Sequence, residues 1–154
     1  MISRRDFVSQ AAGLALTSIG AARLLARSSV PTPIAVYKSA SCGCCGKWVD
    51  YVRAHGFAPT VHDEENMDAI KDDMGVPKGV RSCHTAVVGK YVVEGHVPVE
   101  DIRRLLENHP AVAGVAAPGM PASSPGMGSP GAPVEPYQVV TFTADGRTAV
   151  FARH

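Results

Sequence analysis

Three of the four cysteines in this 154-residue chain fall within four consecutive positions, Cys42 to Cys45, and this cluster constrains the fold most. A short apolar run, Ile34 to Tyr37, precedes the cluster and predicts a buried strand. Residues 47–55 follow it with apolar side chains spaced for one helix face, and Gly56 is placed to end that helix. The cysteines therefore occupy the junction of a strand and a helix, which indicates an α/β fold.

The pattern that follows predicts one compact domain over residues 33–110. The elements expected after the first helix are a weak strand at 58–62, a helix at 65–74, strands at 85–88 and 91–94 joined by a turn at Gly89-Lys90, and an amphipathic helix at 98–108. The order βαβαββα is that of a thioredoxin-like domain, and we expect this fold class. In the helix at 65–74, Met67, Ile70 and Met74 are expected to face inward.

The composition changes after Pro110. Residues 111–136 are rich in Gly, Pro, Ala and Ser, contain two methionines and have no regular apolar period, so they predict a long loop or extended arm. Residues 137–154 predict a C-terminal β-hairpin with a turn at Asp145-Gly146. Because an isolated two-stranded hairpin is only marginally stable, we expect it to pack on the domain.

The first 30 residues are typical of a targeting segment. Arg4 and Arg5 precede Phe7 and a modest apolar stretch, a pattern that resembles a twin-arginine signal for export across the bacterial inner membrane. The stretch is too short and too rich in Ala and Gly to predict a membrane span. Cleavage of this segment is expected between residues 26 and 32, and the alternative is that the segment stays uncleaved as an anchor. The mature chain is then expected in the periplasm.

Charge excludes two classes of partner. The formal net charge is +1, and acidic and basic residues are mixed along the chain. This distribution provides no basic surface for nucleic acid or for anionic lipid. Neither nucleic acid nor a membrane beyond the signal segment is therefore expected as a partner.

The position of the cysteine cluster favours metal or disulfide chemistry. Backbone N–H groups and the helix dipole stabilise thiolates at the start of a helix, and the thiolate binds soft metals or attacks disulfides. Cys42 and Cys45 form a C-x-x-C pair, which serves in redox proteins and in metal sites, whereas a simple oxidoreductase does not need Cys44. In a thioredoxin-like topology Cys83, just before the strand at 85–88, faces this loop. All four thiols are therefore expected to converge.

Histidine and methionine side chains extend the candidate ligand set. Sulfur ligands select Cu(I), zinc or iron–sulfur clusters, and imidazole also suits copper and zinc. Methionines that follow glycines in a mobile arm have few neighbours to pack against, so a thioether could cover the site from there. The candidate metal ligands are Cys42, Cys44, Cys45, Cys83, His84, His96, Met120 and Met127.

Other interpretations of the same residues stay open. The four cysteines suit two structural disulfides in an oxidising compartment, His84 suits a plain loop position, and His96 suits a hydrogen-bonded structural role. Packing alone is an equal alternative for the two arm methionines. Met67 and Met74 are expected in the core, and His55, His62, His109 and His154 on the surface.

Taken together, several short motifs resemble the CopG-type family of periplasmic copper-resistance proteins, formerly described as a domain of unknown function. The motifs are Cys42-Gly43-Cys44-Cys45-Gly46-Lys47-Trp48, Ser82-Cys83-His84-Thr85-Ala86, Glu94-Gly95-His96-Val97-Pro98, and Pro118-Gly119-Met120-Pro121 with Gly126-Met127. The match extends from about Ile34 to the end of the chain. The resemblance implies a thioredoxin-like fold, a copper cluster bridged by the cysteines, and a role in copper tolerance that involves a change of the metal's oxidation state.

The leading hypothesis is thus a periplasmic protein that binds several copper ions, as Cu(I), and exchanges them with periplasmic partners that the sequence does not identify. The first alternative is a thiol–disulfide oxidoreductase that uses Cys42 and Cys45. The second is a structural zinc or iron–sulfur protein, since four sulfurs suit either. Whether the chain is an enzyme stays open at this point.

Overall fold

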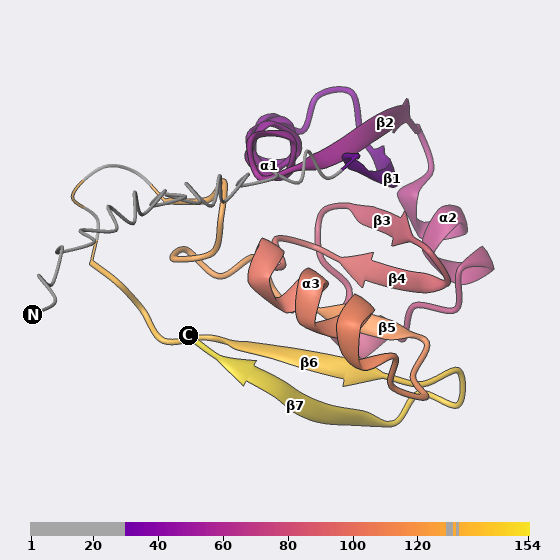
Figure 1. The fold of residues 1–154 in the computed structure, drawn as a ribbon. Coiled ribbons are helices and arrows are strands. Elements are labelled where there is room, and N and C mark those ends of the chain that lie inside the picture. The colour runs from indigo at the N-terminus through magenta and orange to yellow at the C-terminus, as the bar shows by residue number, and fades with distance from the viewer. Residues whose placement is uncertain (1–29, 129–130, 132) are drawn as a thin grey trace, which may run out of the picture.

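The structure is a computed structural model that describes residues 30–128, 131 and 133–154. The predicted signal segment, residues 1–30, lies outside the described residues except for Val30. The described elements, in chain order, are β1 (Thr32–Lys38), α1 (Gly43–Ala54), β2 (Phe57–Asp63), α2 (Met67–Asp73), a 3-10 helix (Lys78–Val80), β3 (Thr85–Val88), β4 (Tyr91–Glu94), α3 (Val99–Asn108), β5 (Gly114–Ala116), β6 (Gln138–Phe142) and β7 (Thr148–Arg153) (Figure 1).

Seven strands form one mixed sheet in the order β2-β1-β3-β4-β5-β6-β7. The β1–β2 and β4–β5 pairs are parallel, and the other neighbours are antiparallel. From β1 to α3 the elements follow the predicted order βαβαββα. The molecule is therefore a mixed α/β fold with three α-helices among its described residues.

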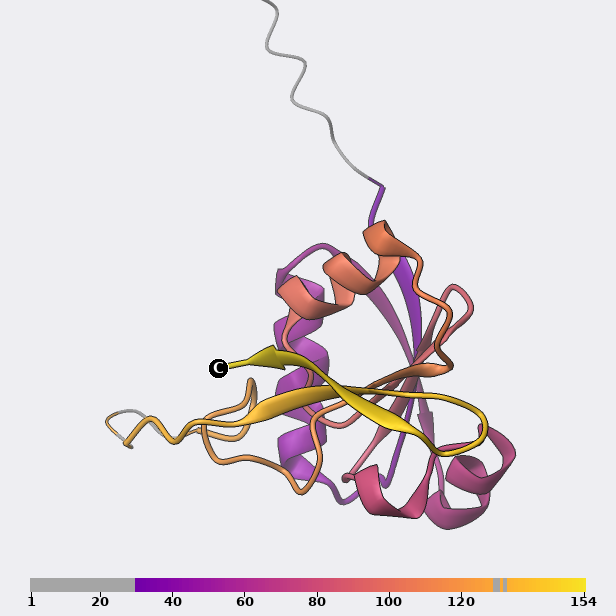
Figure 2. The same ribbon diagram turned by 90° about the horizontal axis from the view of Figure 1, so that it is seen from below.

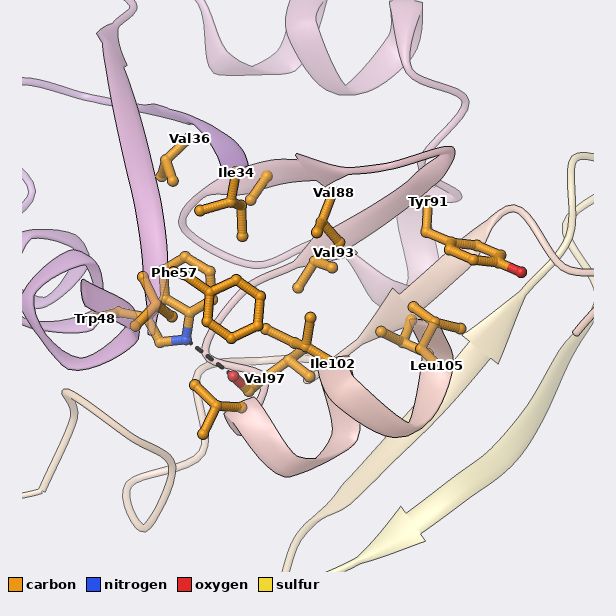
Figure 3. Close-up of a cluster of buried hydrophobic side chains, with 14 of the residues drawn as sticks. Ile34, Val36, Trp48, Phe57, Val88, Tyr91, Val93, Val97, Ile102 and Leu105 are labelled. Carbon is orange, nitrogen blue, oxygen red and sulfur yellow. Dashed lines mark hydrogen bonds between the residues drawn. The ribbon is translucent and has the colours of Figure 1, made fainter. Parts of the chain in front are cut away.

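The sheet buries apolar side chains on both faces. Figure 2 shows α1 and α3 on one side of the sheet and α2 on the other. The larger core lies between the sheet and helices α1 and α3. Figure 3 labels Ile34, Val36, Trp48, Phe57, Val88, Val93, Ile102 and Leu105 among its residues, and Val52 of α1 also belongs to it. Within it the indole N–H of Trp48 donates to the carbonyl oxygen of Val97 at 3.0 Å. A smaller cluster of Val76, Val80, Ala116 and Phe142 lies on the α2 side.

Helix α1 begins earlier than predicted. The sequence predicted a cysteine loop followed by a helix from Lys47, but α1 starts at Gly43 with Cys42 as its extended N-cap residue. The N–H of Gly46 donates to the carbonyl of Cys42 at 3.3 Å, so helical hydrogen bonding starts within the cluster. Burial of Cys45 and Trp48 against the core offsets the low helix propensity of the two glycines. The cysteines thus form the first turn of a helix.

The prediction for the inner side of α2 was only partly right. Met74, the C-cap residue, packs against the smaller core cluster, but Met67 and Ile70 are only partly buried, and the buried residue of α2 is Lys71. A lysine gives no apolar signal, so a hydrophobic pattern could not identify it as the residue that faces the sheet.

The predicted arm, residues 111–136, contains a strand that the sequence did not indicate. Strand β5 lies between β4 and β6 and pairs with both. The β6–β7 hairpin therefore extends the main sheet instead of packing on it as a separate unit, and Figure 1 shows it continuing the sheet beyond β5. Phe151 of β7 also stacks under the guanidinium of Arg104 at 4.0 Å, which ties the hairpin to α3.

Candidate metal centre

All four cysteines lie together at the N-terminal end of α1. The metal-ligating atoms of Cys42, Cys44, Cys45 and Cys83 all lie within 4.8 Å of one another. The first three belong to the first turn of α1, and Cys83 belongs to the segment before β3, which pairs with β1. The predicted convergence of Cys83 with the cluster is therefore observed, and the four sulfurs form a group able to hold a metal ion.

The thiols differ in redox state. Cys42 and Cys45 are joined by a disulfide, while Cys44 and Cys83 are free thiols in the described structure. The sulfur of Cys44 lies 3.5 Å from that of Cys42. Cys45 is fully buried and the other three are partly accessible. The structure therefore represents the oxidised form of the C-x-x-C pair, with two thiols remaining beside it.

Two buried histidines surround Cys83. Its sulfur lies 3.0 Å from Nε2 of His96 and 3.4 Å from Nδ1 of His84. Nδ1 of His96 donates its hydrogen to the carbonyl oxygen of Pro125 at 2.7 Å, because a carbonyl can only accept. Nε2 of His96 consequently carries the lone pair and accepts from the thiol of Cys83. Cys83, His84 and His96 form a second group whose ligand atoms lie within 4.8 Å of one another.

Burial sets the protonation of these three side chains. Removal from water and, to a smaller extent, the neighbouring Cys44 together raise the pKa of the Cys83 thiol to about 12. Burial lowers the pKa of His84 well below 6.5, assisted by the nearby His96, and burial also lowers the pKa of His96. At neutral pH the metal-free site therefore holds a neutral thiol and two neutral imidazoles. Neutral imidazole is the form that binds metals.

A buried ion pair supports the Cys83 segment, and sequence reasoning missed it. Nζ of Lys71 donates to Oε1 of Glu94 at 2.6 Å and to the hydroxyl oxygen of Thr85 at 2.9 Å. The Glu94 carboxylate also accepts from the backbone N–H of Ser82 and from the hydroxyl of Thr85, both at 2.6 Å. Burial raises the pKa of Glu94, against the lowering effect of Lys71. Since Ser82 and Thr85 flank Cys83 and His84, this network fixes the two candidate ligands in place.

The arm passes over the start of α1. A Cβ at Gly126 would lie 2.9 Å from the backbone nitrogen of Trp48 and 3.3 Å from the carbonyl oxygen of Cys44, so the arm backbone contacts α1 directly. Met127, the next residue, is half-buried, whereas Met120 is 44% exposed. The structure therefore brings the Pro125–Met127 end of the arm to the site and leaves Met120 facing solvent.

The remaining histidines are on the surface, as predicted: His55, His62, His109 and His154 are all exposed. His154 nevertheless has a structural partner, because its Nε2 lies 2.7 Å from the carboxylate of the buried Asp101.

Two residues at the site were not singled out from the sequence. Trp48 has its ring centroid 4.4 Å from that of His84, and Pro125 accepts the hydrogen bond from His96. The Trp48 side chain was expected only as part of a helix face.

Comparison with known proteins gives one family. The family model described as "Protein of unknown function, DUF411" matches residues 80–127. Two solved structures, described as copper resistance protein copG in Form 1 and Form 2, are each 44% identical in sequence to this chain and match it with TM-scores of 0.75 and 0.76. Each match covers 80% of this chain and 98% of the other. No curated protein sequence gives a significant match.

In residues 30–128, 131 and 133–154, no helix has both the length and the hydropathy needed to cross a membrane.

Proposed function

This chain belongs to the CopG family of copper resistance proteins, and we propose that it is a periplasmic copper-binding protein that holds a cysteine-bridged copper cluster. Export by a twin-arginine signal in residues 1–30 is part of the proposal, since the arginine pair and the apolar stretch after it suit that route. We further propose residues 33–110 as a thioredoxin-like metal-binding domain, completed by the arm and the hairpin; the order β2-β1-β3-β4 supports this assignment.

The observation that carries the proposal is the convergence of four sulfurs from two distant segments within 4.8 Å. Thiolate sulfur is a soft ligand that prefers Cu(I) and can bridge two metal ions. Two groups that share Cys83, one of four sulfurs and one of a sulfur and two imidazoles, together offer more donor atoms than a single three-coordinate or four-coordinate ion needs. The donor set therefore fits several Cu(I) ions.

Formation of the cluster requires reduction of the Cys42–Cys45 disulfide. Two electrons and two protons from a dithiol reductant convert it to two thiols, which restores four sulfur ligands. Cu(I) then displaces the thiol protons, including the one that Cys83 holds at neutral pH. The disulfide form thus lacks the cluster, so the thiol pair links cluster formation to redox conditions. Oxidation of the two thiols back to the disulfide releases two protons and two electrons, which would reduce two Cu(II) ions to Cu(I).

His84, His96, Met120 and Met127 are the proposed auxiliary ligands. Support is strongest for the histidines, whose nitrogens lie within 3.4 Å of the Cys83 sulfur. Met127 is supported by its position next to Gly126, which contacts α1. Met120 is exposed, so it suits a role in passing copper to a periplasmic partner more than a fixed place in the cluster.

A thiol–disulfide oxidoreductase is the second candidate, and the disulfide between Cys42 and Cys45 favours it. Such an enzyme cycles through the pair alone, so Cys44 and Cys83 would be dispensable. A tetrahedral zinc ion or an iron–sulfur cluster is the third, because four cysteine ligands also suit those groups.

Elemental analysis of the mature protein, purified anaerobically after growth with copper, tests these candidates. We expect several copper ions per chain, and we expect Cys44→Ser to lose the cluster and to hold at most one copper ion, while insulin reduction by the Cys42–Cys45 pair is little changed. An exposed substitution, His109→Gln, is the control and retains copper. Zinc or iron in place of copper, or protein that binds no Cu(I) after reduction, would contradict the proposal.

A further inference from the structure

We propose that Cys83, His84 and His96 form a mononuclear Cu(II) site that is available while Cys42 and Cys45 are joined by their disulfide. The inference rests on the proposed function in one respect, because it takes copper to be the metal that the chain meets. It differs from the cluster in its ligands, in the number of ions and in the oxidation state of the metal.

The distances between the three side chains fit one bound ion. A metal about 2.0 Å from imidazole nitrogen and about 2.3 Å from thiolate sulfur keeps those two atoms roughly 3.5 Å apart. Nδ1 of His84 lies 3.4 Å from the Cys83 sulfur and Nε2 of His96 lies 3.0 Å from it. The ligands therefore need to separate by only a few tenths of an ångström to admit the ion.

The second nitrogen of His96 already has the partner that metal-binding histidines use. Such histidines almost always donate their other N–H to a carbonyl or carboxylate, which fixes the tautomer and the ring orientation. In His96, Nδ1 donates to the carbonyl oxygen of Pro125 at 2.7 Å and leaves the Nε2 lone pair facing Cys83. This arrangement is present without a metal, so the ring is preorganised.

Hydrogen bonding alone does not explain why the polar side chain of His84 is buried. The side chain is fully buried between Trp48 and His96, with ring centroids at 4.4 Å and 4.9 Å. Its Nε2 has no hydrogen-bond partner among the described residues, and buried polar atoms without partners are uncommon. Because the Cys83 thiol donates to His96, Nδ1 of His84 can only donate weakly to the same sulfur. Nε2 finds no partner among the described residues in either tautomer, so the tautomer with the ring proton on Nε2 is accessible, and its Nδ1 lone pair then faces the Cys83 sulfur and can bind a metal.

Ligand chemistry and the disulfide together select Cu(II). Two imidazoles and one thiolate in a trigonal arrangement are the ligands of mononuclear blue-copper sites. The disulfide removes two of the four sulfurs that a Cu(I) cluster needs, but it leaves Cys83 and both histidines untouched. The oxidised protein therefore retains one binding site for copper, and that site suits the oxidised metal.

The test uses Cys44→Ser in its disulfide form. This variant cannot complete the four-sulfur cluster, and Cys83 is its only free thiol, so Cu(II) cannot form a Cys44–Cys83 disulfide. A count of one free thiol per chain verifies that the Cys42–Cys45 disulfide is formed and that Cys83 is reduced before the titration. Titration with copper(II) sulfate is followed by visible absorption and electron paramagnetic resonance. We expect one Cu(II) per chain and the intense absorption of thiolate-to-Cu(II) charge transfer.

Further substitutions in the Cys44→Ser background locate the ligands. Cys83→Ser, His84→Gln and His96→Gln should each abolish the charge-transfer band, and His109→Gln should retain it. Circular dichroism verifies folding of each variant, and a band that survives in any one folded ligand variant removes that residue from the site. Absence of the band in folded Cys44→Ser, or its persistence in both histidine variants, overturns the inference.

Cu(I) titration of the reduced wild-type protein separates this inference from the proposed function. Several Cu(I) ions per chain with no Cu(II) band in Cys44→Ser would leave the cluster standing and refute the mononuclear site. Failure of the reduced wild-type protein to bind several Cu(I) ions, together with a Cu(II) band in Cys44→Ser, would refute the cluster and leave the Cu(II) site standing.

Discussion

Cys83 belongs to both groups of candidate ligands. Its sulfur lies among the three sulfurs of α1 and also within 3.4 Å of two imidazole nitrogens. Burial raises the pKa of its thiol to about 12, so a metal must displace a proton that neutral water does not remove. Copper binding at this residue is therefore expected to strengthen as the pH rises.

The buried histidines give the metal-free protein a defined pH dependence. Burial holds the pKa of His84 well below its ordinary 6.5, so below pH 6.5 the unfolded chain binds a proton that the folded chain does not. The free energy of unfolding should therefore fall as the pH drops through 6.5 towards the folded pKa. Each such proton contributes about 1.4 kcal/mol per pH unit. His96 has a shift in the same direction and adds to the effect.

Urea unfolding of the metal-free protein between pH 7.5 and pH 5 measures this dependence. His84→Gln should flatten the slope below pH 6.5, and the exposed His109→Gln should not. An unchanged slope in folded His84→Gln would show that His84 is protonated as easily in the folded chain as in the unfolded one.

The sequence identified the right ligand types but not their surroundings. His84 and His96 were recognised because a cysteine, glycines and a proline adjoin them. Their burial, and the bond from His96 to Pro125 across 29 residues, depend on how the arm folds back, which no local pattern encodes. Lys71 was missed because a charged residue on a helix is usually solvated, and only its pairing with Glu94 permits burial.

Helix α2 connects to the site through Lys71. The ion pair with Glu94 holds the backbone of Ser82 and the hydroxyl of Thr85, which flank two candidate ligands. Removal of one partner of a buried pair leaves the other charge without compensation, which costs about 3–5 kcal/mol. Helix α2 therefore positions the Cys83 segment although it contributes no ligand.

Lys71→Met should lower the free energy of unfolding by about 3–5 kcal/mol, as measured by urea denaturation. Lys71→Met/Glu94→Gln should recover much of this loss, because no unpaired charge is then buried. The matched surface change Arg53→Ala, which breaks the exposed pair with Asp50, should alter stability little. Equal stability of Lys71→Met and the wild type would mean that the ion pair does not hold this segment.

The arm is held against α1 by a glycine that leaves no room for a side chain. Gly126 has φ of +85°, and a Cβ there would lie 2.9 Å from the backbone nitrogen of Trp48. Gly119 is a matched control with φ of +70° and nothing within 4 Å of its Cβ position. An alanine at either position strains the backbone, but only at Gly126 does it also collide with α1.

Gly126→Ala should therefore displace the arm and break the bond from His96 to Pro125, while Gly119→Ala should not. Hydrogen exchange and limited proteolysis of residues 117–128 measure arm release, and Cu(I) titration measures its effect on the site. Overpacking of this kind typically costs about 1–3 kcal/mol. If the two variants behave alike, the arm contact is not specific.

Across the whole molecule, the sheet is more continuous than the sequence indicated. The apolar and helical periods predicted the elements from β1 to α3 and the terminal hairpin in the right order. They failed at β5, which has only three residues, lies in a segment rich in small residues and is paired on both sides. A Cβ at Gly114 would lie 2.0 Å from the carbonyl oxygen of Val92, so glycine allows this close pairing although it is a poor strand former.

This continuity places the candidate ligands on one connected framework. The cysteines at the start of α1 follow β1, Cys83 precedes β3, and His96 follows β4, and these three strands are neighbours in the sheet. Among the residues that the structure describes, the arm alone reaches the site from outside that framework. The sheet therefore determines where the sulfurs and imidazoles meet, and the arm contacts His96 and the start of α1 beside them.

X-ray absorption at the copper edge of the reduced, copper-loaded protein tests the central claim most directly. A cysteine-bridged cluster predicts a first shell dominated by sulfur, together with short copper-to-copper scattering that disappears in Cys44→Ser. A first shell of oxygen and nitrogen, or a sulfur shell with no copper-to-copper scattering at full loading, would contradict the account.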